Sequence, residues 1–99
     1  MKKLAVVAHA NDNVATAVKD LKEGQEVMVD VDGKEVKVKL LNDVLFGHKF
    51  ALKDISKGEN IIKYSEVIGK ATQLIKMGEH VHVHNIESVR GRGDWEGDS

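Results

Sequence analysis

The sequence contains no cysteine and no proline, and only four of its 99 residues are aromatic. Without cysteine the chain cannot form a disulfide scaffold, an iron–sulfur cluster or a thiolate nucleophile. The 15 Lys and Arg residues nearly balance the 16 Asp and Glu residues, whereas a general nucleic-acid binder carries a clear basic excess. No apolar run approaches the ~18 residues of a membrane-spanning helix. The composition predicts one small, soluble, cytoplasmic domain with a modest core.

Apolar spacing near the start of the chain predicts a strand followed by a helix. Residues 4–8 form a continuous apolar run, which is typical of a buried strand and shorter than the ~7–15 residues of a signal-peptide core. Apolar residues between 14 and 21 recur with helical spacing, so we expect a helix there, capped by Asn11 or Asp12. A second short helix is expected over residues 68–78.

The rest of the chain is dominated by strand and turn signals. Alternating valines on both sides of Asp32-Gly33 predict a β-hairpin with a type I′ turn. A glycine, two polar residues and a β-branched residue recur from positions 24, 58 and 78, which indicates short strands joined by sharp turns. Further strands are expected at residues 45–52, 61–64 and 79–86. The predicted fold class is mostly β with two short helices.

Three of the five histidines, His80, His82 and His84, occupy alternate positions. In a strand they would share one face, with neighbours ~7 Å apart along the chain and the outer pair ~13 Å apart. A His-x-His pair can bind one metal ion but needs further ligands, which His9 or His48 could supply. The alternative is a hydrated face of histidines satisfied by hydrogen bonds.

His9 lies in a polar elbow just before the first expected helix, together with Asp12 and Asn13. Free N–H groups and the dipole at a helix N-terminus favour anions, so His9 could act as an acid, a base or a ligand beside a bound carboxylate. The alternative is that the elbow residues only cap the helix.

Two lysines, Lys49 and Lys63, are candidates for binding an anion. Lys49 follows Gly47-His48, and Lys63 precedes Tyr64. The alternative is that both are ordinary surface lysines with apolar stems. The sequence contains no nucleophile elbow, phosphate loop or dinucleotide fingerprint. The residues alone therefore leave the function open.

Five blocks, in order, resemble the SAF domain of the altronate/galactarate dehydratase family. The resemblance extends from Lys3 to Ile86 and departs from the family pattern at Ala10, where proline is common, and at Ser65, where glycine is common. The blocks are HANDNVA at 9–15, GHKFAL at 47–52, IKY at 62–64, IGKAT at 68–72 and GEHVHVHN at 78–85.

The resemblance implies a β-clip architecture for residues 1–86, followed by a polar, flexible tail at 87–99 that is a candidate partner contact. In this family the domain is the N-terminal part of a long dehydratase or a separate small subunit, and a separate form also occurs in sulfolactate sulfo-lyase. The implied reaction is a β-elimination from a sugar acid, assisted by iron(II) or another divalent metal ion.

We therefore expect a cytoplasmic small subunit that is inactive alone and completes an active site on a large catalytic dehydratase subunit. No nucleic-acid or membrane partner is expected, and the isolated chain is a candidate homo-oligomer. The alternatives are the small subunit of sulfolactate sulfo-lyase and a non-catalytic module that binds a sugar acid or a metal. The expected site residues are His9 and His48 for catalysis, Asp12, Asn13, Lys49 and Lys63 for substrate, and His82 and His84 for the metal.

Overall fold

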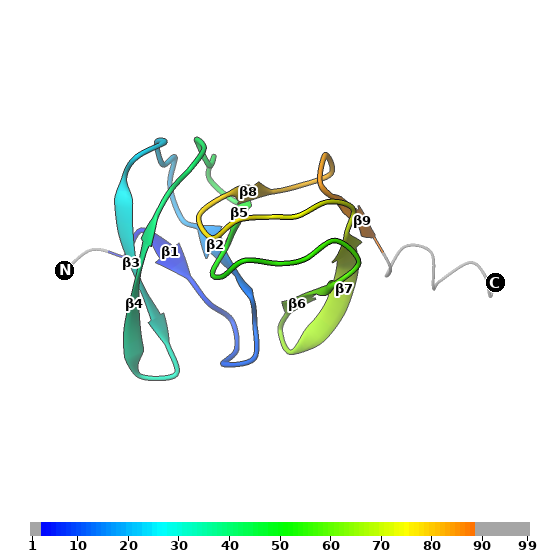
Figure 1. Ribbon diagram of the computed structural model, residues 1–99. Helices are drawn as coiled ribbons and strands as arrows, with labels where there is room; N and C mark the ends of the chain where they lie inside the picture. Colours follow the sequence, from blue (N-terminus) through cyan, green and yellow to red (C-terminus); the bar gives the residue numbers. More distant parts are fainter. Residues whose placement is uncertain (1–2, 89–99) are drawn as a thin grey trace.

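The computed structural model describes residues 3–88, which form nine β-strands in three antiparallel sheets and no helix (Figure 1). The expectation of a mostly β domain is confirmed, and the expectation of two short helices is wrong. Within residues 3–88 there is accordingly no helix with the length and apolar character needed to cross a membrane.

The central sheet has four short strands in the order β1-β2-β5-β8. All neighbouring strands in it are antiparallel, and β5 joins β2 to β8. Its strands are β1 (Ala5–Val6), β2 (Val14–Ala17), β5 (Lys49–Ala51) and β8 (His80–Val81).

Two smaller sheets flank the central sheet. On one side lies the predicted hairpin of β3 (Glu26–Val31) and β4 (Lys34–Lys39), and the positive φ angles of Asp32 (53°) and Gly33 (83°) confirm its type I′ turn. The other side carries three strands, β6 (Asn60–Lys63), β7 (Glu66–Ala71) and β9 (Ile86–Ser88), in the order β6-β7-β9.

The central sheet is buried on both faces, because successive residues of a strand point in opposite directions. In β5, Phe50 packs into a core with the β3–β4 hairpin, whereas Ala51 packs into a second core with β6 and β7. In β2, Ala15 and Ala17 face the first core and Val14 faces the second. The two cores therefore meet across one thin layer of strands.

This double burial explains why the two helix predictions are wrong. A strand that is buried on both faces is apolar at consecutive positions, and its spacing can then imitate a helix. The first predicted helix is instead β2 followed by a turn, after which Leu21 forms a bridge with Val44. The second is β7 followed by a turn, after which Ile75 forms a bridge with Ile55.

Glycine turns follow these bridging residues and lead into the next strands. Gly47 follows Val44 and adopts a left-handed backbone (φ 85°), as the glycines at the three positions noted in the sequence also do. At Gly78 a side chain is excluded by packing as well, because a Cβ atom would overlap the carbonyl oxygen of Lys39. The turns at Gly47 and Gly78 lead directly to His48 and His80, two of the histidines considered below.

Candidate metal and anion site

Four histidine side chains lie together at one end of β5 and β8. The rings of His48 and His82 stack with centroids 4.4 Å apart, and His48 and His80 stack at 5.1 Å. The Nδ1 atom of His48 is 2.9 Å from Nε2 of His80. His48, His80 and His82 each offer one ring nitrogen, and these three atoms lie within 4.8 Å of one another. This arrangement could hold a metal ion.

His84 joins the cluster because the chain does not continue as a strand. The strand expected at residues 79–86 breaks after Val81, and residues 82–85 form a tight turn before β9. The ring centroid of His84 therefore lies 5.3 Å from that of His80, where an extended strand would not bring the two rings together. The ring nitrogens of His84 are not in the three-residue group.

The turn is held by Asn85, whose side chain is fully buried. Its Oδ1 accepts a hydrogen bond from the backbone N–H of His82 at 3.0 Å, and its Nδ2 donates to the backbone carbonyl of His80 at 2.8 Å. Because a buried amide with both ends paired has one orientation, Asn85 defines the path of the chain from His80 to His82.

The electrostatic environment favours neutral imidazole rings. Partial burial lowers the pKa of His80, and the neighbouring His48 lowers it further. The pKa of His82 is lowered by desolvation, then by His48 and Lys49. Only a neutral imidazole has a lone pair for a metal ion, so these shifts reduce the competition from protons.

Lys49 and Lys63 line a small cavity of about 290 Å³ with Tyr64. The pKa of Lys49 is lowered by burial and by the charge of Lys63, while Lys49 in turn acts on His82. The Nζ atom of Lys63 lies 5.0 Å from the centroid of the Tyr64 ring. Two ammonium groups that repel each other are suited to binding an anion, because the anion relieves the repulsion.

The polar elbow is not at a helix N-terminus, since β2 follows it. The buried carboxylate of Asp12 accepts hydrogen bonds from three backbone N–H groups, those of His9, Tyr64 and Ser65. The buried side chain of Asn13 accepts from the N–H of Ile62 and donates to the carbonyl of Asn60. Both residues thus attach the elbow to the β6–β7 hairpin, and their expected contact with substrate stays a prediction.

The ring of His9 lies in the elbow and is not part of the three-residue metal-ligand group. Its Nδ1 accepts a hydrogen bond from the backbone N–H of Asn11 at 3.3 Å. The expected anion site at a helix end has no basis in the described fold, because no helix begins there. A catalytic role for His9 stays a prediction that needs other support.

Two residues of this region were not among the site residues expected from the sequence. His80 completes the group with His48 and His82, and its position in the alternating histidine row was a signal. Asn85 ends the last sequence block of the resemblance, but its buried position depends on a turn that the strand prediction did not include. The suggested partner contact beyond residue 88 lies outside the described residues.

Comparison with known proteins agrees with the resemblance. A sequence profile described as the altronate/galactarate dehydratase SAF domain matches residues 3–89. The chain is 56% identical over 80 residues to altronate dehydratase of Escherichia coli K12, and the match covers 81% of this chain and 15% of that protein. Altronate dehydratase of Bacillus subtilis is 40% identical over 80 residues, and 15% of its length is covered.

A shorter relative is matched over nearly its whole length. The (2R)-sulfolactate sulfo-lyase subunit alpha of Chromohalobacter salexigens is 36% identical over 89 residues, which is 86% of this chain and 94% of the relative. The relatives thus include a domain of long dehydratases and a lyase subunit of similar size. The family assignment rests on the profile match and on these alignments: the chain belongs to the altronate/galactarate dehydratase SAF-domain family.

Proposed function

We propose that this chain is the small subunit of a metal-dependent lyase that acts on a small hydroxy acid, of the kind represented by (2R)-sulfolactate sulfo-lyase subunit alpha. One observation carries the proposal: a cluster of three imidazole rings lies beside a cavity with two ammonium groups. A hydroxy acid has a hydroxyl group that a metal ion can polarise and an anionic group that lysines can bind.

His48, His80 and His82 would hold the divalent cation. The donor set fits, because three neutral imidazoles are typical of catalytic sites that leave a coordination position for water or substrate. A cation bound there supplies Lewis-acid stabilisation of the negative charge that develops on oxygen. Iron(II) is the cation that the resemblance implies. His84, whose ring lies tilted beside that of His80, would limit the movement of that ring or supply a further ligand.

Lys49 and Lys63 would orient the substrate through its carboxylate or sulfonate group. Both line the cavity, and Lys49 lies close enough to His82 to lower its pKa. In a β-elimination a base removes the proton next to the carboxylate while the leaving group departs from the adjacent carbon. Binding at the two lysines would place these carbons near the histidines. We retain His9 as the candidate for proton transfer and Asp12 and Asn13 as residues that shape the site.

The rest of the active site would come from a larger partner chain. The cavity is small, and three histidines with two lysines do not provide a complete set of acid and base groups for elimination. The match over 94% of a lyase subunit alpha supports a small-subunit role. The β-clip architecture and the division into a domain and a polar tail are part of the same proposal. The expected boundary after residue 86 moves, because β9 carries the domain to Ser88.

Altronate or galactarate dehydration is the second candidate function. The specific observation in its favour is the 56% identity to altronate dehydratase, which exceeds the identity to the sulfo-lyase subunit. The coverage favours the sulfo-lyase type, since only 15% of the dehydratase is matched. A module that binds a sugar acid or a metal without catalysis is the remaining alternative.

The proposal is tested by purifying the tagged chain from its native host and assaying the eluate with Fe²⁺. Sulfite release from (2R)-sulfolactate and dehydration of altronate and galactarate are measured side by side. We expect a larger chain to co-purify and one of these substrates to be consumed. Lys49→Gln is expected to raise the KM at least about tenfold, because a charged hydrogen bond to the anion is lost, whereas the exposed Lys53→Gln serves as the control.

Two results would contradict the proposal. One is a chain that purifies without a partner and consumes none of the three substrates with added metal. The other is an equal loss of activity for Lys49→Gln and Lys53→Gln, which would show that the lysine cavity does not bind the substrate. Binding of a sugar acid without turnover would support the non-catalytic module instead.

A further inference from the structure

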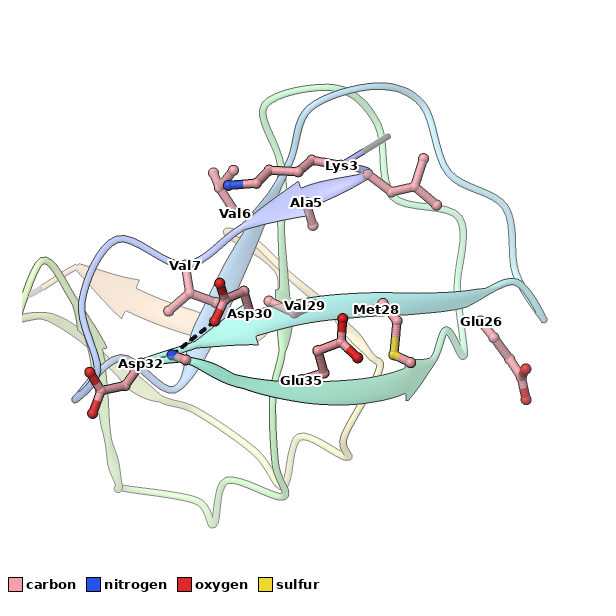
Figure 2. A pocket seen from close by; sticks show the side chains of 12 residues that line it. Lys3, Ala5, Val6, Val7, Glu26, Met28, Val29, Asp30, Asp32 and Glu35 are labelled. Atoms are coloured by element: carbon pink, nitrogen blue, oxygen red, sulfur yellow. Dashed lines mark hydrogen bonds between the residues drawn. The ribbon is translucent and has the colours of Figure 1, made fainter. Parts of the chain in front are cut away.

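A second cavity lies between β1 and the β3–β4 hairpin, and none of the four clustered histidines lines it (Figure 2). This groove has a volume of about 780 Å³. Its floor includes the buried side chains of Ala5 and Val29, and the half-exposed side chains of Val6 and Met28 line it. The groove is therefore lined by apolar side chains and flanked by two strands that each end a sheet.

The free edge of β1 faces away from β2. Ala5 is opposite Ala17, and Val6 is opposite Thr16. In an antiparallel pair, alternate residues of a strand direct their backbone groups at the neighbouring strand. The N–H of Val18 donates to the carbonyl of Leu4, so the backbone groups of Leu4 and Val6 point toward β2. The backbone N–H and carbonyl of Ala5 point to the other side, where β1 has no strand partner among residues 3–88.

The free edge of β3 has the same character. The N–H of Leu40 donates to the carbonyl of Gln25, and every second residue of β3 from there bonds to β4 through its backbone. These residues include Val27 and Val29. The backbone groups of Met28 and Asp30 then point away from β4, and β3 has no other strand partner within residues 3–88. Both residues line the groove. Two unpaired strand edges with an apolar floor are a template for a further strand.

The charges around the groove select the kind of strand that fits. Glu26, Asp30, Asp32 and Glu35 line it, against a single cation, Lys3. Asp30 already accepts a hydrogen bond from the N–H of Gly33, and Lys37 lies 3.8 Å from Glu26. Asp32 and Glu35 have no ion pair within residues 3–88. The groove is therefore complementary to a positively charged segment.

We propose that this groove binds an extended segment of another polypeptide in which apolar residues alternate with lysine or arginine. The segment adds as a strand to the edge of β3. Its backbone bonds to Met28 and Asp30, its apolar side chains point to the inner face with Ala5 and Val29, and its cations lie on the outer face with Asp30 and Glu35. The histidine cluster takes no part, so the surface serves attachment of a partner irrespective of the reaction.

The experiment uses the ¹⁵N-labelled full chain and two matched peptides, acetylated seven-residue alternations of lysine with valine and of glutamate with valine. The lysine peptide is expected to shift the amide resonances of Ala5, Met28 and Asp30 saturably and to slow hydrogen exchange of Met28 and Asp30 at least about tenfold. Glu35→Lys is expected to weaken binding about tenfold, because it reverses a charge beside the bound cations.

Glu23→Lys is the matched control, since Glu23 is exposed and lies outside the groove. It should bind the lysine peptide as the unmodified chain does. Equal binding of the glutamate peptide, shifts confined to residues outside the groove, or no binding at millimolar peptide would each overturn the proposal. A dimer that forms through these edges without peptide, detected by sedimentation and by the same resonances, would overturn it in favour of a second copy.

Discussion

The buried side chain of Asn85 connects the two neighbouring histidines of the candidate metal site, because it accepts from the N–H of His82 and donates to the carbonyl of His80. One amide thus determines the turn that brings His82 beside His48. The backbone N–H of His80 is bound separately by the exposed Asn42 at 2.9 Å. The geometry of the site therefore depends on a residue that does not itself belong to the metal-ligand group.

Asn85→Ala should lower the free energy of unfolding by about 2–3 kcal/mol, because it leaves a partly buried N–H and a partly buried carbonyl without partners. It should also weaken Co²⁺ binding. The control, Asn42→Ala, removes an exposed bond and should cost less than about 1 kcal/mol. Urea unfolding and cobalt absorbance measure the two effects. Equal costs for the two variants would show that Asn85 does not hold the turn.

Removal of any one imidazole of the three-histidine group should reduce the affinity for Co²⁺ at least about tenfold. His48→Ala, His80→Ala and His82→Ala are compared by cobalt titration at pH 7.5. His9→Ala should retain the affinity, because its ring lies outside this group. If it also reduces the activity of the complex with the partner chain while the fold is intact, the predicted catalytic role of His9 gains support.

The same titration with His84→Ala tests whether His84 is a ligand of the metal ion or only a neighbour of His80. The ring of His84 lies tilted beside that of His80 but outside the three-residue group, so its loss should reduce the affinity less than the loss of His48. A loss as large as that of the other three would assign His84 as a fourth ligand, as the sequence predicts.

The free energy of unfolding should fall as the pH drops below about 6.5, the ordinary pKa of histidine. Desolvation lowers the pKa of His80 and His82 in the folded chain, so between the folded and unfolded pKa values the unfolded chain binds more protons. Stability then rises with pH through this window and levels off above it. Urea titrations of the metal-free chain from pH 5 to 8 measure the slope. A double variant, His80→Gln with His82→Gln, should have a flatter profile, and an unchanged slope would contradict this assignment.

Ser65→Gly should raise the free energy of unfolding by about 0.5–1 kcal/mol. Ser65 adopts a left-handed backbone with φ 60°, which disfavours every side chain, and glycine removes that cost while losing some chain entropy. The exposed hydrogen bond from Asn11 to the Ser65 hydroxyl is a small loss. Thermal unfolding measures the change. A lower melting temperature would mean that this bond outweighs the backbone strain.

Gly78→Ala should prevent folding or lower the free energy of unfolding by several kcal/mol, because the added Cβ overlaps the carbonyl of Lys39. Gly58→Ala is the matched control, since it has a similar φ of 87° but open space for a Cβ. It should cost only the left-handed backbone penalty, about 1–2 kcal/mol. Expression in soluble form and circular dichroism compare the two. Equal behaviour would contradict the packing argument.

The predictable part of the fold is the part governed by local signals. The hairpin around Asp32-Gly33 was predicted because alternation and a two-residue turn act within a dozen residues. The segment 14–21 was assigned wrongly because Val14 and Ala17 contribute to two different cores. That distinction depends on strands far away in the sequence, so the apolar spacing of this segment does not reveal it.

In the candidate site, too, the features set by local sequence were predicted and those set by distant residues were not. The alternating row that contains His80 and His82 indicated a cluster, and the extra ligand expected from His48 lies beside it. The sequence did not predict that His84 would turn back onto His80, because the break depends on the buried Asn85. Asp12 was expected to cap a helix that does not form. Its carboxylate instead accepts from backbone N–H groups on a hairpin some 50 residues away, and such partners depend on tertiary structure.

Because β2 and β5 contribute to both cores, the two cores are expected to unfold together. Phe50 and Ala51 are adjacent, yet each belongs to a different core, so neither core can melt while the other keeps its full set of contacts. Heating should therefore produce a single calorimetric transition in which both lobes are lost together. A chain cut after residue 52 would keep the buried residues of the first core but leave Phe50 without β8 beside it, and the second fragment would lack Val14 and Ala51 of its core.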